Sequence, residues 1–219
     1  MYVTPMVEPE IHGITGLVTS ILNAPRQGHR RIVAIAGPPG SGKSTVAKAL
    51  VPLIAQAGGL AQVVPMDGFH LDNSILIERN LIDVKGSPGT FDVGGFTKLI
   101  SRLSKEPEIV FPKFDRDKDL AIAGAGFVSE DCDLVLVEGN YLLLDAPFWR
   151  DLFKYWDFSV FLDVEPKLLR ERLVKRWLDQ GLSSDQAKKR VKDNDLVNVE
   201  TVVSGSSVAD FTFVNSSLT

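Results

Sequence analysis

Short apolar runs alternate with helical patterns along most of this chain. Nearly continuous apolar runs occupy residues 32–36, 61–66, 133–137, 158–164 and 209–214. Runs of this length without polar alternation predict strands that are buried on both faces of a parallel sheet. Between them, apolar residues recur at helical spacing, most clearly in residues 8–24 and at Phe96, Leu99, Ile100 and Leu103. This alternation predicts one three-layer α/β domain over residues 1–219, with a mostly parallel five-stranded sheet.

The remaining segments give weaker local signals. Residues 71–82 and the stretch that opens at Asp145 are each expected to form a short helix. The densely charged segment 112–119 reads as a solvated loop after a short extended segment. Near the C-terminus, Gly181 should end one helix, and residues 183–186 have the capping-box pattern that begins another.

The segment between the first strand and the next helix carries the most specific motif. Residues 37–45, Gly-Pro-Pro-Gly-Ser-Gly-Lys-Ser-Thr, fit G-x-x-x-x-G-K-[ST] at every fixed position. The glycines let backbone N–H groups approach phosphate oxygens, and the helix that follows adds the positive end of its dipole. Lys43 is expected to reach the β- and γ-phosphates, and Ser44 to ligate Mg²⁺. We therefore expect a nucleoside triphosphate to bind Gly37, Pro38, Pro39, Gly40, Ser41, Gly42, Lys43, Ser44 and Thr45.

Two carboxylates stand where predicted strands end. Asp67 follows the run 61–66, and Glu138 follows the run 133–137. In an open α/β sheet, this edge borders the crevice where ligands bind. A carboxylate next to a buried strand is costly unless it meets a cation or hydrogen-bond donors, which Mg²⁺ or its waters would supply. Ser44, Glu138 and Asp67 are therefore the metal-site candidates, although Asp67 before Gly68 also fits a turn former.

Composition and charge limit the classes of function. The chain has 219 residues, 44% of them hydrophobic and 24% charged, and a net charge of −4. Residues 165–192 carry a net +5, which leaves −9 elsewhere. A basic segment can bind nucleic acid, but the acidic remainder favours a triphosphate. For this reason we do not expect a nucleic-acid partner. We do not expect a membrane partner either, because no apolar run approaches 20 residues. The lone Cys132 and the absence of a secretory signal predict a cytoplasmic protein.

Six stretches together resemble one family of P-loop kinases, which includes uridine kinase, phosphoribulokinase and bacterial pantothenate kinase. They read GPPGSGKST, MDGFH, KGSPGTFD, FPKFDRD, LVLVEGNYLLL and LRERLVKRW, from residue 37 to about residue 177. The resemblance implies a P-loop NTPase fold with a helical lid at about residues 168–192, acting on ATP with Mg²⁺. It also implies that Asp67 is the base toward the acceptor hydroxyl and that Glu138 supports Mg²⁺. Lid arginines of the family contact the phosphates, matching Arg172 and Arg176, so the catalytic candidates are Asp67, Lys43 and Arg172.

The lid helix also has a pattern of its own. Arg172 and Arg176 are four residues apart and share one helical face. Leu169, Leu173 and Trp177 form a neighbouring stripe that we expect to pack inward. A solvated basic face is the alternative for this helix.

The resemblance leaves the acceptor open among a sugar, a nucleoside and a pantothenate-like molecule. It implies that the segment around Asp115 and Arg116 lines the acceptor site, together with His70, Lys85 and Tyr141 of the matching stretches. Uridine kinases have a histidine in this acceptor loop, which here reads KFDRDKD, and the chain is shorter than pantothenate kinases. A homodimer is one expectation for its assembly.

A GTPase-type switch that hydrolyses nucleotide without an acceptor is the alternative function. Asp92-Val-Gly-Gly95 fits D-x-x-G, but nothing in the chain fits the N-K-x-D that reads guanine. Asp92 also fits the N-cap of the helix that carries Phe96 and Leu99.

Overall fold

The computed structural model describes residues 13–215. Within this range the strands are β1 (Arg31–Ala36), β2 (Ala61–Pro65), β3 (Ile109–Asp115), β4 (Leu120–Val128), β5 (Leu134–Gly139), β6 (Phe158–Asp163) and β7 (Phe211–Val214). The helices are α1 (Ile14–Asn23), α2 (Lys43–Gln56), α3 (Asn73–Glu78), α4 (Val93–Leu103), α5 (Pro166–Asp179), α6 (Ser184–Arg190) and α7 (Leu196–Gly205). Residues 8–12 of the first predicted helix lie outside the described residues.

The five apolar runs form one parallel sheet in the order β2-β5-β1-β6-β7. Successive residues of a strand point to opposite faces. In β1, Ile32 and Ala34 pack on one face of the sheet, whereas Val33 and Ile35 pack on the other. A strand buried on both faces has no polar positions, which is why the runs appear continuous in the sequence.

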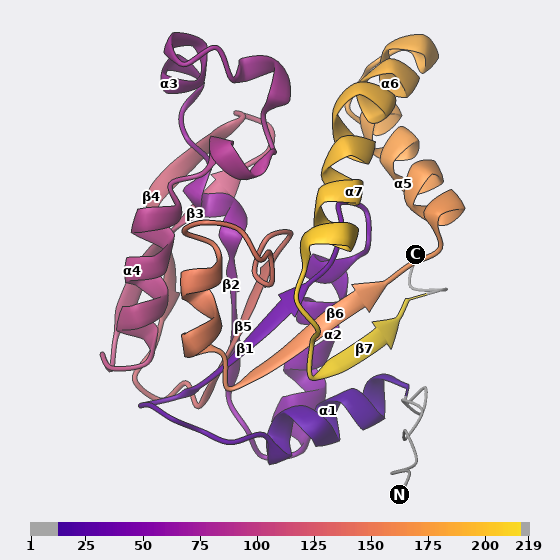
Figure 1. The fold of residues 1–219 in the computed structure, drawn as a ribbon. Helices are drawn as coiled ribbons and strands as arrows, with labels where there is room; N and C mark the ends of the chain where they lie inside the picture. The colour runs from indigo at the N-terminus through magenta and orange to yellow at the C-terminus, as the bar shows by residue number, and fades with distance from the viewer. Residues whose placement is uncertain (1–12, 216–219) are drawn as a thin grey trace, which may run out of the picture.

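Helices cover both faces of this sheet and complete a three-layer P-loop fold, as predicted (Figure 1). Helices α1 and α2 pack on one face through residues such as Leu17 and Leu50. Helix α4 packs on the other face through its predicted stripe, which includes Phe96 and Ile100. No helix within residues 13–215 is long and apolar enough to span a bilayer.

The charged segment 112–119 was predicted to be a loop, and this prediction was wrong. The segment belongs to a β-hairpin. Strands β3 and β4 pair antiparallel, and only residues 116–119 form the turn between them. The partners Val110 and Phe127 are both more than half exposed, so one face of the hairpin has no covering layer. Charged residues near the turn and two glycines in β4 therefore hid the strand pattern. The helix predicted after Asp145 was also wrong in type, because residues Arg150–Tyr155 form a 3₁₀ helix.

Helices α5, α6 and α7 stand on the other side of the molecule from the hairpin (Figure 1). Helix α5 ends before Gly181, whose φ of 89° is left-handed. The predicted capping box then begins α6, with the Ser183 hydroxyl accepting from the backbone N–H of Gln186. A π-helical turn (Val191–Asp195) joins α6 directly to α7.

Candidate active site

A cavity of about 990 Å³ lies beside the loop that follows β1. Its walls come from this loop, from the ends of β2 and β5, from the tip of the β3–β4 hairpin and from α5 to α7. Ligands of open α/β sheets bind at the carboxyl ends of the strands, where this cavity is. The sheet topology thus brings together segments that are more than 150 residues apart in the chain.

The glycine motif forms a tight loop at one end of the cavity. Gly40 and Gly42 have φ values of 79° and 88°, in the left-handed region where other residues are strained. The loop ends where α2 begins at Lys43. Backbone N–H groups at the start of a helix attract anions, so this end of the cavity can hold phosphate.

Lys43 is a buried cation with few partners. Its Nζ donates to the carbonyl oxygen of Pro38 at 2.9 Å and lies 3.4 Å from the Ser41 hydroxyl. Burial lowers the pKa of Lys43 to about 8, against the opposing effect of the Glu138 and Asp67 charges. A phosphate oxygen would stabilise this charge, because it would supply the counterion that the buried ammonium lacks.

Glu138 and Ser44 meet across the base of the loop. The Ser44 hydroxyl donates to Glu138 Oε1 at 3.0 Å. Burial raises the pKa of Glu138, and the nearby Asp67 charge adds to the effect. The hydroxyl and the carboxylate are hard oxygen donors that fit Mg²⁺, which usually takes one or two protein oxygens and completes its shell with phosphate and water. Within residues 13–215 there is no cluster of three or more acidic, His or Cys side chains that would hold a metal by itself.

Asp67 lies in the 3₁₀ turn after β2 and faces the same cavity. Its Oδ2 accepts from Arg116 Nη2 of the hairpin tip at 2.6 Å. His70 also lines the cavity, with Nδ1 2.8 Å from the carbonyl oxygen of Asp67 and its ring near those of Phe91 and Phe114. Because the carbonyl accepts, Nδ1 carries the proton and Nε2 is left as an acceptor. Burial lowers the pKa of His70, which favours this neutral form.

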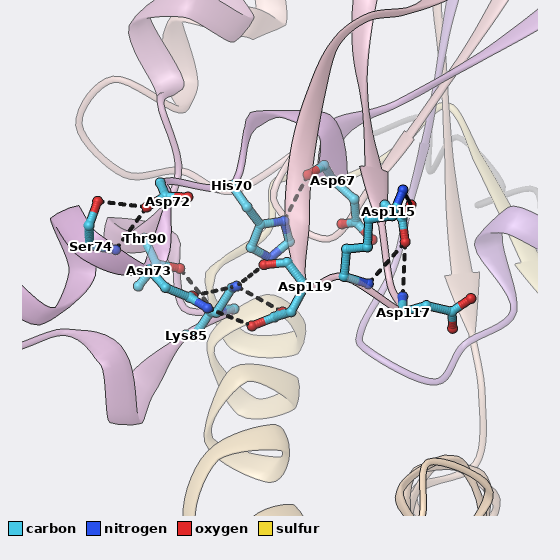
Figure 2. A network of polar contacts seen from close by, with 12 residues as sticks. Asp67, His70, Asp72, Asn73, Ser74, Lys85, Thr90, Asp115, Asp117 and Asp119 are labelled. Atoms are coloured by element: carbon cyan, nitrogen blue, oxygen red, sulfur yellow. Dashed lines mark hydrogen bonds and ion pairs between the residues drawn. The ribbon is translucent and has the colours of Figure 1, made fainter.

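Lys85 is the centre of a polar network at the far end of the cavity (Figure 2). Its Nζ donates to Asn73 Oδ1 at 2.7 Å, to Asp119 Oδ1 at 2.8 Å and to the Asp119 carbonyl at 3.1 Å. Asn73 Nδ2 donates in turn to Asp119 Oδ2 at 2.9 Å. The ammonium also lies 5.1 Å from the ring centroid of Phe114. This network holds the loop that carries Lys85 against the hairpin tip.

Two of the expected acceptor-site residues lie outside the cavity lining. Asp115 Oδ1 accepts from the backbone N–H groups of Asp117 and Lys118 and so stabilises the hairpin turn (Figure 2). Tyr141 is fully buried, and its hydroxyl donates to the carbonyl oxygen of Gly86 at 2.6 Å. Both residues support the walls of the cavity rather than face it.

The two lid arginines occupy different places. Arg172 lies against the glycine loop, with Nη1 3.4 Å from the Gly40 carbonyl oxygen, and does not line the cavity. Arg176 lines the cavity, and its Nη2 donates to Asp195 Oδ1 at 3.0 Å. Arg172 Nη2 and Arg176 Nε are buried and have no hydrogen-bond partner among the described residues. Buried N–H groups of this kind could each bind a phosphate oxygen of a nucleotide.

Trp177 was predicted to pack inward with Leu169 and Leu173, and this prediction was wrong. Only the two leucines are buried. The Trp177 ring lines the cavity, and its Nε1 donates to Asp195 Oδ2 at 2.5 Å. The indole N–H finds its acceptor, Asp195, on the side of the helix that faces the cavity.

Sequence reasoning missed several residues of the cavity wall, and a signal for some of them was present. The buried residues of the helix from α6 to α7 are Ala187, Val191, Asn194, Asp195, Asn198 and Val202. This stripe is apolar at both ends and polar in the middle, where it lines the cavity. A polar break in a buried helical stripe is the pattern that could have identified Asn194, Asp195 and Asn198. Asp119 had no comparable signal, because its position depends on the hairpin.

Comparisons with known proteins agree with this geometry. A family model described as an AAA domain matches residues 33–192. The uncharacterised Escherichia coli protein YggC is 37% identical over 93% of this chain and 83% of its own length. A Schizosaccharomyces pombe protein with the provisional name of uridine kinase is 30% identical over 89% of this chain and 87% of its own.

A solved structure extends the agreement to the whole fold. The Silicibacter protein described provisionally as a fructose transport system kinase is 46% identical and has a TM-score of 0.89, over 92% of this chain and 99% of its own. Pantothenate kinases match over a shorter part of their length, 49% for that of Mesorhizobium japonicum. The chain therefore belongs to the P-loop kinases of the uridine kinase and pantothenate kinase family.

Proposed function

We propose that this protein transfers the γ-phosphate of ATP, with Mg²⁺, to a hydroxyl group of a small metabolite. The observation that carries the proposal is that two carboxylates in different environments, Glu138 and Asp67, line the cavity beside the glycine loop. Glu138 is buried against the Ser44 hydroxyl, which suits a metal ion, whereas Asp67 faces the cavity and suits a base. An enzyme that only hydrolyses nucleotide has no need of the walled compartment beyond Asp67.

The chain's residues can perform each part of the transfer. Asp67 takes the proton of the acceptor hydroxyl while the hydroxyl oxygen forms a bond to the γ-phosphorus. The bond between that phosphorus and the β-γ bridging oxygen breaks, which releases ADP. Lys43, Arg172 and Arg176 hold the phosphate oxygens and stabilise the charge that develops on them. Ser44 and Glu138 would hold Mg²⁺, which would supply positive charge to neutralise the triphosphate. Positioning and electrostatics account for most of such a reaction, so preorganised groups suffice.

The names of the relatives support an alcohol as acceptor. Uridine kinase and pantothenate kinase are both names of enzymes that phosphorylate a hydroxyl group, as a sugar kinase also does. These acceptors differ in size and charge, so the names leave the class open for this chain. ATP and such metabolites occur together in the cytoplasm, where we expect the enzyme to act.

The alternative of a GTPase switch has no observation in its favour. The carboxylate of Asp92, the first residue of the D-x-x-G match, accepts from the backbone N–H of Gly95 at 2.8 Å and caps α4. The match is therefore explained by a helix cap, as the sequence predicted.

One assay tests the proposed function. Nucleotide turnover is measured with ATP and with GTP, each with and without a mixed pool of hydroxylated metabolites. We expect ADP release that depends on ATP and rises at least about tenfold with the pool, because in-line transfer needs a positioned hydroxyl. Phosphorylated products should appear by mass spectrometry. A rate that does not change when the pool is added, or a preference for GTP, would contradict the proposal.

A further inference from the structure

The polar middle of the α6–α7 stripe faces the cavity opposite the Lys85 network. Asn194, Asp195 and Asn198 are each at most 6% exposed, yet all three line the cavity. Asn194 and Asp195 belong to the π-helical turn, a feature that often occurs at functional sites. Buried amides are normally hydrogen-bonded, so the bonds that these side chains make indicate what is left for a ligand.

The hydrogen bonds fix the orientation of both amides. Asn194 Nδ2 donates to the carbonyl oxygen of Lys85 at 3.0 Å, so Asn194 Oδ1 is an acceptor that faces Asn198. Asn198 Nδ2 donates to it at 3.5 Å. Asn198 therefore keeps one N–H and its Oδ1 without a partner among residues 13–215. A donor and an acceptor side by side match a hydroxyl group, which also donates and accepts.

Three of the cations at this end of the cavity, Lys85, Arg116 and Arg176, are already paired with carboxylates. The Lys85 ammonium uses its three N–H groups on Asn73 and Asp119. Arg116 is paired with Asp67 at 2.6 Å.

The cations of the helical wall have partners as well. Arg176 Nη2 is paired with Asp195 at 3.0 Å, and its buried Nε, which we assign to the nucleotide, has no partner among the described residues. Arg190 donates to the Asp83 carbonyl and lies 5.3 Å from the Trp177 ring centroid. A carboxylate or phosphate on the acceptor would have to displace a carboxylate from Lys85, Arg116 or Arg176, or draw Arg190 from the Trp177 ring. It would also meet the lone pairs of Asn198 and the acidic side chains that line this end of the cavity. An uncharged molecule avoids both costs.

We propose that Asn198 binds a hydroxyl group of an uncharged, polyhydroxylated acceptor, and that Asn194 positions the Asn198 amide. The rings of His70 and Phe114 lie at the same end and give the C–H face of such a molecule an apolar contact. This inference rests on the proposed kinase function. It adds the charge class of the acceptor and the residue that recognises it.

The first test offers wild-type enzyme and ATP three separate pools. They contain neutral sugars with their alditols, anionic hydroxy acids with sugar phosphates, and nucleosides. ADP release and phosphorylated products are measured. We expect turnover with one of the two uncharged pools, the sugars or the nucleosides. Turnover only with the anionic pool would overturn this inference and leave the kinase function standing, whereas no turnover with any pool would overturn both.

The second test measures the kinetics of variants with the best acceptor found. Asn198→Ala should raise the acceptor KM about tenfold, as expected for a lost hydrogen bond to an uncharged group, and change the ATP KM less than twofold. Asn198→Asp keeps the shape but removes the N–H donors, so it should raise the acceptor KM too, even if the alanine variant folds poorly. Val197→Ala, an exposed residue of the same helix, is the matched control.

The positioning role of Asn194 is tested by a double-mutant cycle. Because Asn194 acts through Asn198, Asn194→Ala should raise the acceptor KM in wild-type enzyme by about threefold and have almost no effect in the Asn198→Ala background. Additive effects would contradict the positioning role. An unchanged acceptor KM in both Asn198 variants, or equal changes in the acceptor and ATP KM values, would overturn the binding role.

Discussion

The two ends of the cavity are built in opposite ways. At the loop end, the buried charged groups form no ion pair: Lys43 has a lowered pKa, Glu138 has a raised pKa, and Arg172 Nη2 has no acceptor among the described residues. At the hairpin end, the charges of Lys85 and Asp119 satisfy one another. The first end therefore needs a charged ligand, whereas at the second end Lys85 and Asp119 are balanced and the unused hydrogen-bonding groups of Asn198 are uncharged.

This difference shows how one cavity can separate two ligands. A group with an unmet charge attracts a ligand of opposite charge strongly, because a buried charge without a partner is costly. A closed network offers only directional hydrogen bonds, which contribute selectivity more than affinity. The phosphates should thus be held at the loop end and the acceptor be sorted by its hydroxyl groups at the hairpin end.

The largest effect is expected from removing Lys43, the buried cation of the loop end, which tests whether this end binds the charged ligand. Lys43→Met should lower kcat by at least about 10³-fold, because the role that we propose for the lysine is to stabilise the charge that develops in the transition state. ATP affinity should also fall, which isothermal titration measures. Activity close to that of wild type would remove the central assignment of the loop end.

The same variant should not lower the stability of the empty protein. Burial lowers the Lys43 pKa to about 8 from an unfolded value of 10.5. The unfolded chain therefore binds more protons between these values, so wild-type stability should rise as pH increases through them. Below pH 8 the buried charge costs up to about 3 kcal/mol, which Lys43→Met removes. Thermal unfolding of both proteins from pH 7 to pH 10 checks this difference, and a steep loss of stability in the variant would contradict it.

The second largest effect on catalysis is expected at Asp67, which lines the cavity between its loop end and its hairpin end. Asp67→Asn should lower kcat by roughly 10²–10⁴-fold and leave the ATP KM within a few-fold, as expected for a positioned base. Arg116→Lys serves as a comparison, because it keeps the charge next to Asp67. Normal kcat in the asparagine variant would return Asp67 to the role of a turn former.

The lid arginines sharpen the comparison further. Arg172→Ala should lower kcat by about 10²-fold or more, because its unpartnered N–H group can bind phosphate. Lys188→Ala is the matched control, since Lys188 is an exposed cation of the next helix. Segment 170–190 should also exchange its amide hydrogens more slowly when an ATP analogue and an acceptor are bound. Equal small effects for both variants, without protection, would indicate a solvated basic face.

The smallest effect is expected at Glu138. Its raised pKa means that protons compete with Mg²⁺, so the Mg²⁺ concentration for half-maximal activity should rise as pH falls. Glu138→Gln should raise this concentration about tenfold, as expected for the loss of an outer or inner metal partner, and remove most of its pH dependence. Mg²⁺ titrations at several pH values, with saturating ATP, measure both. Identical titrations for the two proteins would leave Glu138 with a purely structural hydrogen bond.

The sequence by itself determined the parts of the molecule that depend on neighbouring residues. The loop from Gly37 to Thr45 needs only a local order of glycines between a strand and a helix. The strands of the parallel sheet appear as apolar runs, and both faces are covered most completely in β1 and β5. The edge strand β7 was also expected to be buried on both faces, but its residues Thr212 and Val214 are exposed. The capping residues Asp92 and Ser183 satisfy N–H groups of their own helices, so they could be read from spacing.

Only the tertiary structure decided which residues share the far end of the cavity. Asp119 reaches Lys85 because the hairpin forms, and the hairpin has too few buried residues to leave a clear pattern. Asp115, the last residue of β3, was expected to line the cavity. Its carboxylate instead accepts from backbone N–H groups of the hairpin turn. Asn198 lines the cavity because the helix from α6 to α7 packs against a distant part of the chain, where Asn194 donates to the carbonyl oxygen of Lys85. Contacts between segments so far apart depend on packing, which local sequence patterns do not encode.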